Sequence, residues 1–285
     1  MTVDFHTHAF PDRIAASTVA RLESLGGIPS FSDGTVEGLK TRMRQGRISL
    51  AINLPVLTKP TQAEGVNAFA ASLNANSGVD IAKGILSDTP PALISFAGVH
   101  PDVEDADEYM SELRRLGFLG IKIHPDYQGV LFDDERYIRI MSAAKREGLI
   151  TVTHAGFDVA FPNGEIGCTP DRVLRALDRL GGYDRLVLAH LGGNEMQGEV
   201  AEKLAGEEIY FDTSLVLPHI SRHSFEKVLA RHDPRRILFG SDSPWSDIAE
   251  SRRILHSFVS DPDTEEMILV GNALELLRRS AEGNE

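Results

Sequence analysis

Several features that would assign a chain to a special class are missing from these 285 residues. A single cysteine, Cys168, leaves no disulfide partner within the chain, which fits a reducing compartment. No apolar run reaches the roughly 18 residues of a membrane-spanning helix. The start of the chain also lacks the charged and apolar regions of a secretory signal. We therefore expect a soluble, cytoplasmic, globular protein.

An excess of positive charge is missing as well. The chain has 29 Lys and Arg against 42 Asp and Glu, a formal net charge of −13, and a pI near 5.2. This balance disfavours a long contact with a nucleic-acid backbone. Neither glycine-rich phosphate motif, G-x-G-x-x-G or G-x-x-x-x-G-K, occurs. We expect a small-molecule substrate as partner, no nucleic acid and no membrane, and leave a homo-oligomer open.

Short apolar segments bounded by Gly, Pro, Asp or Asn recur along the chain. Several show no polar alternation until their last residue, which is typical of strands buried on both faces of a parallel sheet. Between them, apolar residues recur at helical spacing, as at Val173, Leu177 and Leu180. Thr169-Pro170 before this stripe suits an N-cap followed by proline. The eight predicted strands are Val3–His8, Ile48–Leu54, Ile94–His100, Leu119–His124, Leu149–His154, Leu186–His190, Ile209–Thr213 and Arg236–Asp242.

This alternation of eight strands with helices predicts an α/β fold, a (β/α)8 TIM barrel, as one domain over residues 1–285. The ends of the first three predicted strands lie much farther apart than the roughly 30 residues of a βαβ unit. We therefore expect insertions in the first two βα units. An open, doubly wound sheet is the alternative, although the phosphate loop that often accompanies it is missing.

Histidines gather at the ends of the predicted strands. Because the carboxyl ends of the strands meet at one rim of a barrel, side chains placed there converge on a common site. Asp242 ends the last predicted strand at the same rim. Of the ten histidines, the six at strand ends are His6, His8, His100, His124, His154 and His190.

The His6-Thr7-His8 motif is the most informative of these features. Residues two apart in a strand point to the same face, so both imidazoles can share one cation. An isolated His-x-His carries little information, but with histidines and an aspartate on later strand ends it indicates a metal site. Asp242 has three interpretations: a metal ligand, a proton acceptor, or the cap of the following helix.

The other marked residues have simpler interpretations. His154 and His190 end buried strands, where a lone histidine can be an ordinary core residue, but together at one rim they indicate function. His100 is a candidate wall of the pocket, and Cys168 is interpreted as a small, unreactive side chain. The histidines on predicted helices or loops are expected at the surface: His219, His223, His232 and His256.

Five motifs together resemble the amidohydrolase superfamily, in particular the branch called amidohydrolase-2, which includes an aminocarboxymuconate-semialdehyde-type decarboxylase. The resemblance extends over essentially the whole chain, and it implies a distorted (β/α)8 barrel with one or two divalent metals, most often zinc. The motifs are H-T-H at His6–His8, G-I-K-I-H-P at Gly120–Pro125, T-H-A-G at Thr153–Gly156, A-H-L-G-G at Ala189–Gly193 and G-S-D-S-P-W at Gly240–Trp245.

The resemblance also implies roles for individual residues. It assigns His190 to polarising the substrate carbonyl or stabilising charge that develops on it. Lys122 is expected to bind a substrate carboxylate rather than to be carboxylated and bridge two metals, and His124 to be a substrate contact or an additional ligand. No glutamate stands at that strand end, which counts against a nuclease branch of the family. One ion is expected, most simply Zn²⁺, and its implied ligands are His6, His8, His154 and Asp242.

These residue types suit a hydrolytic metal site. Imidazoles with one carboxylate are typical zinc ligands, and an open coordination position makes such a site catalytic. Zinc lowers the pKa of bound water from about 16 to about 7. Asp242 would take the proton of that water while His190 supports the oxyanion. The sequence thus predicts hydrolysis of a small amide, lactone or ester, with non-oxidative decarboxylation of a small carboxylic acid, or a non-catalytic binding barrel, as alternatives.

Overall fold

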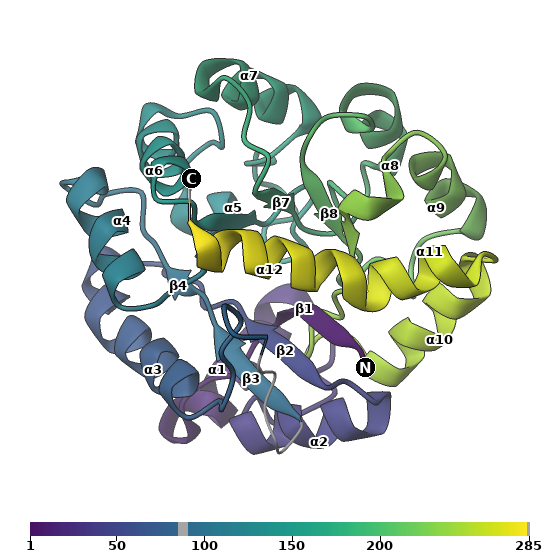
Figure 1. Ribbon diagram of the computed structural model, residues 1–285, viewed down its shortest axis with the longest axis horizontal. Helices are drawn as coiled ribbons and strands as arrows, with labels where there is room; N and C mark the ends of the chain where they lie inside the picture. Colours follow the sequence, from purple (N-terminus) through teal and green to yellow (C-terminus); the bar gives the residue numbers. More distant parts are fainter. Residues whose placement is uncertain (85–90, 284–285) are drawn as a thin grey trace.

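Parallel strands form the centre of the molecule and helices surround them (Figure 1). The computed structural model describes residues 1–84 and 91–283. Strands β1 (Val3–Thr7), β2 (Leu50–Asn53) and β3 (Ala92–Ser95) pair in this order. A second run also pairs in chain order: β4 (Ala97–Gly98), β5 (Gly120–Ile123), β6 (Ile150–Thr153), β7 (Leu186–Leu188), β8 (Tyr210–Asp212) and β9 (Ile237–Leu238).

The two runs join into one closed barrel. β3 and β4 are halves of one strand interrupted at Phe96, whose N–H donates to the Asn53 carbonyl at 3.0 Å. At the other seam, the Phe5 N–H donates to the Phe239 carbonyl at 2.8 Å and the His8 N–H to the Ser243 carbonyl at 2.7 Å. These bonds place the last strand beside the first. The predicted (β/α)8 barrel is confirmed, and the open-sheet alternative is wrong.

Helices cover the outside of the barrel, with extra elements early in the chain (Figure 1). The first βα unit holds two helices, α1 (Asp12–Gly26) and α2 (Val36–Gly46), as the predicted insertion requires. The second holds η1 (Pro60–Gln62) before α3 (Ala63–Ala75). The remaining elements are α4 (Ala106–Arg115), α5 (Pro125–Gln128), α6 (Glu135–Arg146), α7 (Pro170–Leu180), α8 (Gln197–Glu199), η2 (Val200–Leu204), α9 (Arg222–Leu229), η3 (Pro234–Arg236), α10 (Ile248–Phe258), α11 (Pro262–Glu266), η4 (Met267–Gly271) and α12 (Asn272–Glu282).

Local signals fix where the helices begin. The Thr169 side chain accepts the Arg172 N–H and Pro170 opens α7, as predicted. The Asp247 side chain accepts the Glu250 N–H and caps α10. Asp242 lies before this cap, so its interpretation as a helix cap is wrong. Within residues 1–84 and 91–283, no helix combines the length and apolarity needed to cross a membrane.

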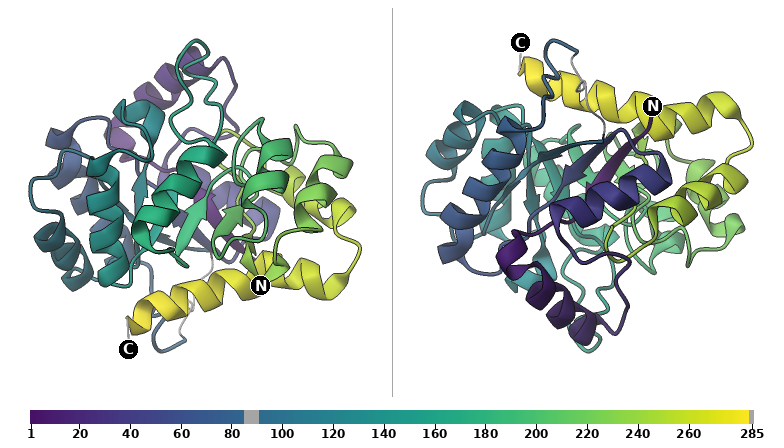
Figure 2. Two further views of the ribbon diagram at one scale, coloured as in Figure 1. Left: turned by 90° about the horizontal axis from the view of Figure 1, so that it is seen from above. Right: turned by 90° about the horizontal axis from the view of Figure 1, so that it is seen from below.

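Helix α12 closes one end of the barrel and leaves the other end for the site. Its buried side chains Ala273, Leu276 and Leu277 belong to one apolar cluster with residues at strand starts, including Val3 and Ile150. Figure 2 shows α12 across one end of the barrel and α1 at the opposite end. The carboxyl ends of the strands therefore open away from α12.

One histidine expected at the surface is buried instead. The His232 ring stacks on Phe211 of β8, with ring centroids 4.1 Å apart. Its Nδ1 accepts the Gly206 N–H and its Nε2 donates to the Ile209 carbonyl at 3.1 Å. Packing against β8 and two backbone partners explains the burial. The other three, His219, His223 and His256, are exposed as predicted.

Candidate active site

A cavity of about 810 Å³ opens at the carboxyl ends of the strands. His100 is not among the described residues that line it. Its Nδ1 accepts the Asp102 N–H at 3.2 Å in the turn that follows β4. The structure therefore does not bring His100 to the site as a pocket wall. The cavity does bring together the other seven predicted site residues: His6, His8, Lys122, His124, His154, His190 and Asp242.

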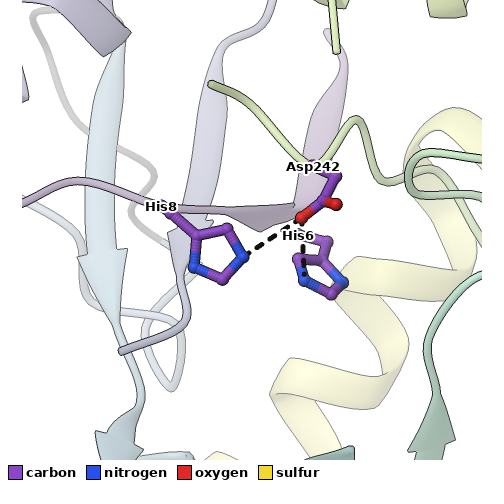
Figure 3. A group of neighbouring side chains, drawn as sticks. All are labelled: His6, His8 and Asp242. Carbon is purple, nitrogen blue, oxygen red and sulfur yellow. Dashed lines mark hydrogen bonds and ion pairs between the residues drawn. The ribbon is translucent and has the colours of Figure 1, made fainter. Parts of the chain in front are cut away.

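His6 and His8 converge on Asp242 at the floor of this cavity (Figure 3). β1 carries His6, and His8 follows two residues later on the same side of the chain. Oδ1 of Asp242 lies 3.3 Å from His6 Nε2 and 3.1 Å from His8 Nε2. Burial acts to raise the pKa of Asp242, but His6 and His8 outweigh it and lower that pKa to about 2. Asp242 is therefore a carboxylate at neutral pH.

The hydrogen bonds of the two imidazoles show that the group fits a metal ion. His8 Nδ1 donates to the Leu54 carbonyl at 2.9 Å, and His6 Nδ1 to the Asp212 carboxylate at 2.8 Å. Burial, with help from Lys122, lowers the pKa of His6 to about 4 and keeps its ring neutral at pH 7. A ring that keeps its proton on Nδ1 can offer the lone pair of Nε2 to a metal ion beside Asp242. Three electron-pair donors face one another, and a divalent cation among them would satisfy all three.

Asp212, which we did not predict as a site residue, holds this floor together. It ends β8 and is fully buried. Besides His6, its carboxylate accepts the N–H groups of His190 at 3.1 Å and Ser214 at 3.0 Å. Burial would raise the pKa of Asp212, but its interactions with His6, among them the hydrogen bond from His6 Nδ1, outweigh it and hold that pKa well below its usual range. The carboxylate thus fixes the tautomer of His6 and places His190.

In the structure, the ring of His190 lies between His154 and the group formed by His6, His8 and Asp242. Its Nδ1 lies 2.9 Å from His190 Nε2, and the rings of His6 and His190 are 5.5 Å apart. His190 Nδ1 donates to the Ser214 carbonyl at 3.0 Å, so its Nε2 accepts from His154. His154 Nε2 is buried and has no hydrogen-bond partner among the described residues. The predicted fourth ligand lies in the same cavity but apart from the other three.

A second polar group forms the opposite side of the floor. The rings of His124 and His154 stack at 4.4 Å, and His124 Nε2 lies 3.5 Å from the Asp158 carboxylate. Lys122 is 1% exposed and makes no hydrogen bond or ion pair within the described part of the chain. Burial lowers the pKa of Lys122 to about 8, opposed by Asp212 and the other nearby carboxylates, so the ammonium form still dominates at pH 7. Lys122 is thus a buried cation near carboxylates but without a hydrogen bond or ion pair among the described residues.

The backbone at the rim is strained where functional side chains leave it. His190 has φ 61°, Leu191 φ 54° and Asp242 φ 70°, all in the left-handed region that residues other than glycine rarely adopt. The Asp242 N–H donates to the His6 carbonyl at 2.8 Å, which holds this conformation. Gly240 lets the chain pass His6, because a Cβ there would lie 2.9 Å from the His6 Cβ. Such strain is typical of functional sites.

The comparisons with known proteins agree on one family and one fold. The family model described as amidohydrolase, of the amidohydrolase-2 type, matches residues 3–279. Comparison with curated protein sequences gives no match. The three solved structures described below are under 25% identical to this chain, and the likeness to each of them therefore shows the fold alone.

Three of these structures are informative. A 2,6-dihydroxybenzoate decarboxylase complexed with 2,6-dihydroxybenzoate has 16% identity and a TM-score of 0.69, covering 97% of this chain and 99% of that one. A Pseudomonas putida protein described as a 2-pyrone-4,6-dicarboxylic acid hydrolase has 14% identity and a TM-score of 0.63, covering 98% and 97%. A dihydroxybenzoic acid decarboxylase from Polaromonas, with bound manganese and the inhibitor 2-nitroresorcinol, has 15% identity and a TM-score of 0.66, covering 97% and 96%.

Proposed function

Because the chain belongs to the amidohydrolase-2 family, we propose that it is a metal-dependent hydrolase that cleaves a small amide, lactone or ester. One observation carries the proposal: the Nε2 atoms of His6 and His8 lie 3.3 Å and 3.1 Å from Oδ1 of Asp242, a set of ligand atoms that suits a divalent ion. When bound, the ion supplies Lewis-acid polarisation and lowers the pKa of water. We propose a single Zn²⁺ ion, with His154 as the fourth ligand.

Asp242 and His190 carry the proton and charge steps in this proposal. Asp242 accepts the proton of the attacking water and passes it to the leaving group, because it is a carboxylate at the floor of the cavity. His190 is oriented by its Nδ1 bond to Ser214 and presents Nε2 to His154 inside the same cavity. We assign His190 to stabilising the charge that develops on the substrate oxygen.

Lys122 indicates that the substrate carries a carboxylate. An ammonium group buried without a partner is costly, and a carboxylate brought in by the substrate would pair with it. His124 lies on the same wall and offers a neutral imidazole, because burial lowers its pKa well below the usual value. We propose that Lys122 binds a substrate carboxylate and that His124 contacts the same molecule.

A second candidate function is non-oxidative decarboxylation of a small carboxylic acid by the same metal site. The unpaired Lys122 favours a carboxylate substrate whichever bond is broken. The fold is shared with a 2,6-dihydroxybenzoate decarboxylase, at a TM-score of 0.69, and with a protein described as a 2-pyrone-4,6-dicarboxylic acid hydrolase, at a TM-score of 0.63. Both candidates therefore need the same residues, and only the products distinguish them.

The deciding experiment uses zinc-loaded protein and two matched substrate panels. One panel contains lactones, esters and amides with a carboxylate, and the other contains the corresponding carboxylic acids without a hydrolysable bond. Acid release from the first panel, abolished by a chelator and restored by zinc, is the expected result. Carbon dioxide release from the second panel, with none of the first hydrolysed, would replace hydrolysis with decarboxylation.

A further inference from the structure

The outer half of the cavity differs in character from its polar floor. We infer that α1 and residues 157–161 form a subsite for an extended apolar substituent of the substrate, so that the substrate is an amphiphilic carboxylate with an alkyl or aryl-alkyl body. The inference rests on the proposed function in one respect: the reacting group is taken to lie at the floor. The apolar character of the subsite depends only on the residues that form the walls of the cavity.

Exposed large hydrophobic side chains concentrate at the mouth of this cavity. Scattered exposed apolar residues are normal, but a group around one opening marks a binding surface. Ile14 and Phe161 are each 37% exposed and Leu25 is 46% exposed, and all three line the cavity. Half of the exposed large hydrophobics in the described residues are thus at one site; the complete set is Met1, Ile14, Leu25, Phe31, Leu116 and Phe161.

Helix α1 forms one wall because it has apolar residues on two sides. Ala15 and Val19 are buried against the protein. Ile14, Leu22 and Leu25, at helical spacing on another side, face the cavity and remain partly exposed. Figure 2 shows α1 at the end of the barrel opposite α12, which is the end toward which the carboxyl ends of the strands open.

Residues 157–161 form the facing wall and connect it to the floor. Phe157, Val159 and Phe161 line the cavity. The Phe161 ring meets Tyr127 edge to face at 5.0 Å, and Tyr127 meets His124 at 4.7 Å. Aromatic surface thus continues from the imidazoles at the floor to the mouth. An apolar group attached to a reacting carboxylate would follow this path.

The charges along the cavity favour an anionic substrate. Arg21 of α1 and Lys59 line the mouth, and Lys122 lies at the floor. The only carboxylates among the described lining residues are Asp158 and Asp242, of which Asp242 is a proposed metal ligand. Three cationic side chains thus face two carboxylates in the cavity, whereas the whole chain has a net charge of −13. A cavity of about 810 Å³ also has room for more than a single ring.

The test measures binding of straight-chain carboxylates, from butanoate to decanoate, to the purified full chain by calorimetry at constant ionic strength. Burial of each methylene should raise affinity about two- to fourfold, the upper value being full burial. Leu25→Ser and Phe161→Ser should flatten this dependence on length, and both positions are exposed enough to keep the fold. Leu116→Ser removes an exposed leucine that is 58% exposed and outside the cavity, and should behave as wild type.

The outcomes separate the two proposals. An affinity that does not change with the length of the carboxylate would contradict the apolar subsite. So would a Leu25→Ser protein whose affinity rises with carboxylate length as steeply as that of Leu116→Ser. Binding requires no turnover, so a length-dependent affinity in a protein inactive on both substrate panels would support the subsite and reject the proposed function. Turnover of short and long substrates with equal KM would support the proposed function and reject the apolar subsite.

Discussion

Replacing Asp212 by asparagine should weaken metal binding although Asp212 is not itself a proposed ligand. One oxygen accepts the N–H groups of His190 and Ser214, and the other accepts His6 Nδ1 at 2.8 Å. In Asp212→Asn, the amide oxygen is held by the two N–H groups, so the NH₂ group faces His6. Because this NH₂ group donates to His6 Nδ1, the ring proton of His6 must lie on Nε2. Nε2 then has no lone pair to offer to the metal ion.

The size of the effect follows from this change of tautomer. Loss of such a supporting contact lowers metal affinity by about 10- to 100-fold, or roughly 1.4 to 2.7 kcal/mol. We would measure zinc affinity by competition with a chromogenic chelator, and check folding by circular dichroism and thermal unfolding. Asp178→Asn, an exposed aspartate on α7, is the matched control. A folded Asp212→Asn protein with wild-type zinc affinity would refute the reasoning.

Three further predictions concern the catalytic residues, the buried lysine and acid stability. Asp242→Asn should abolish activity even with metal bound, whereas His190→Ala should keep one ion and lose about 10²–10³-fold in turnover. Loss of the metal in His190→Ala, together with an active Asp242→Asn protein, would contradict both role assignments. Lys122→Met should raise KM for carboxylate substrates and spare neutral analogues. Burial lowers the pKa of His232 to about 4, so unfolding free energy should fall by up to about 3 kcal/mol between pH 6.5 and 4, because only the unfolded chain binds that proton. His232→Gln should reduce this slope in pH-dependent denaturation, and an unchanged slope would contradict it.

The barrel could be predicted because its signals are local. Apolar strand segments and helical stripes each follow from a few neighbouring residues, and Thr169-Pro170 is a self-contained helix start. The convergence of strand-end histidines then follows from the topology, since parallel strands carry their carboxyl ends to one rim. Six of the residues that line the cavity were predicted in this way, whereas Lys122 was predicted through the resemblance to the amidohydrolase family.

The residues that were missed or misplaced depend on contacts distant in sequence. Asp212 ends β8 after apolar residues, as Asp242 ends the last strand predicted from the sequence, and that signal could have identified it. Asp158 lies in a loop whose path over the floor no local pattern specifies. His232 is buried by the ring of Phe211, and His100 turns toward Asp102 immediately after β4. Each depends on tertiary packing rather than on local spacing.

The most direct test of the central claim is a crystal structure of the zinc-loaded protein with anomalous data at the zinc edge. We predict one ion bound by His6, His8 and Asp242 at about 2.0–2.2 Å, with His154 as the fourth ligand. Two ions about 3.5–4 Å apart, bridged by a carboxylated Lys122, would contradict the single-metal proposal. No ion at His6, His8 and Asp242 would contradict the account as a whole.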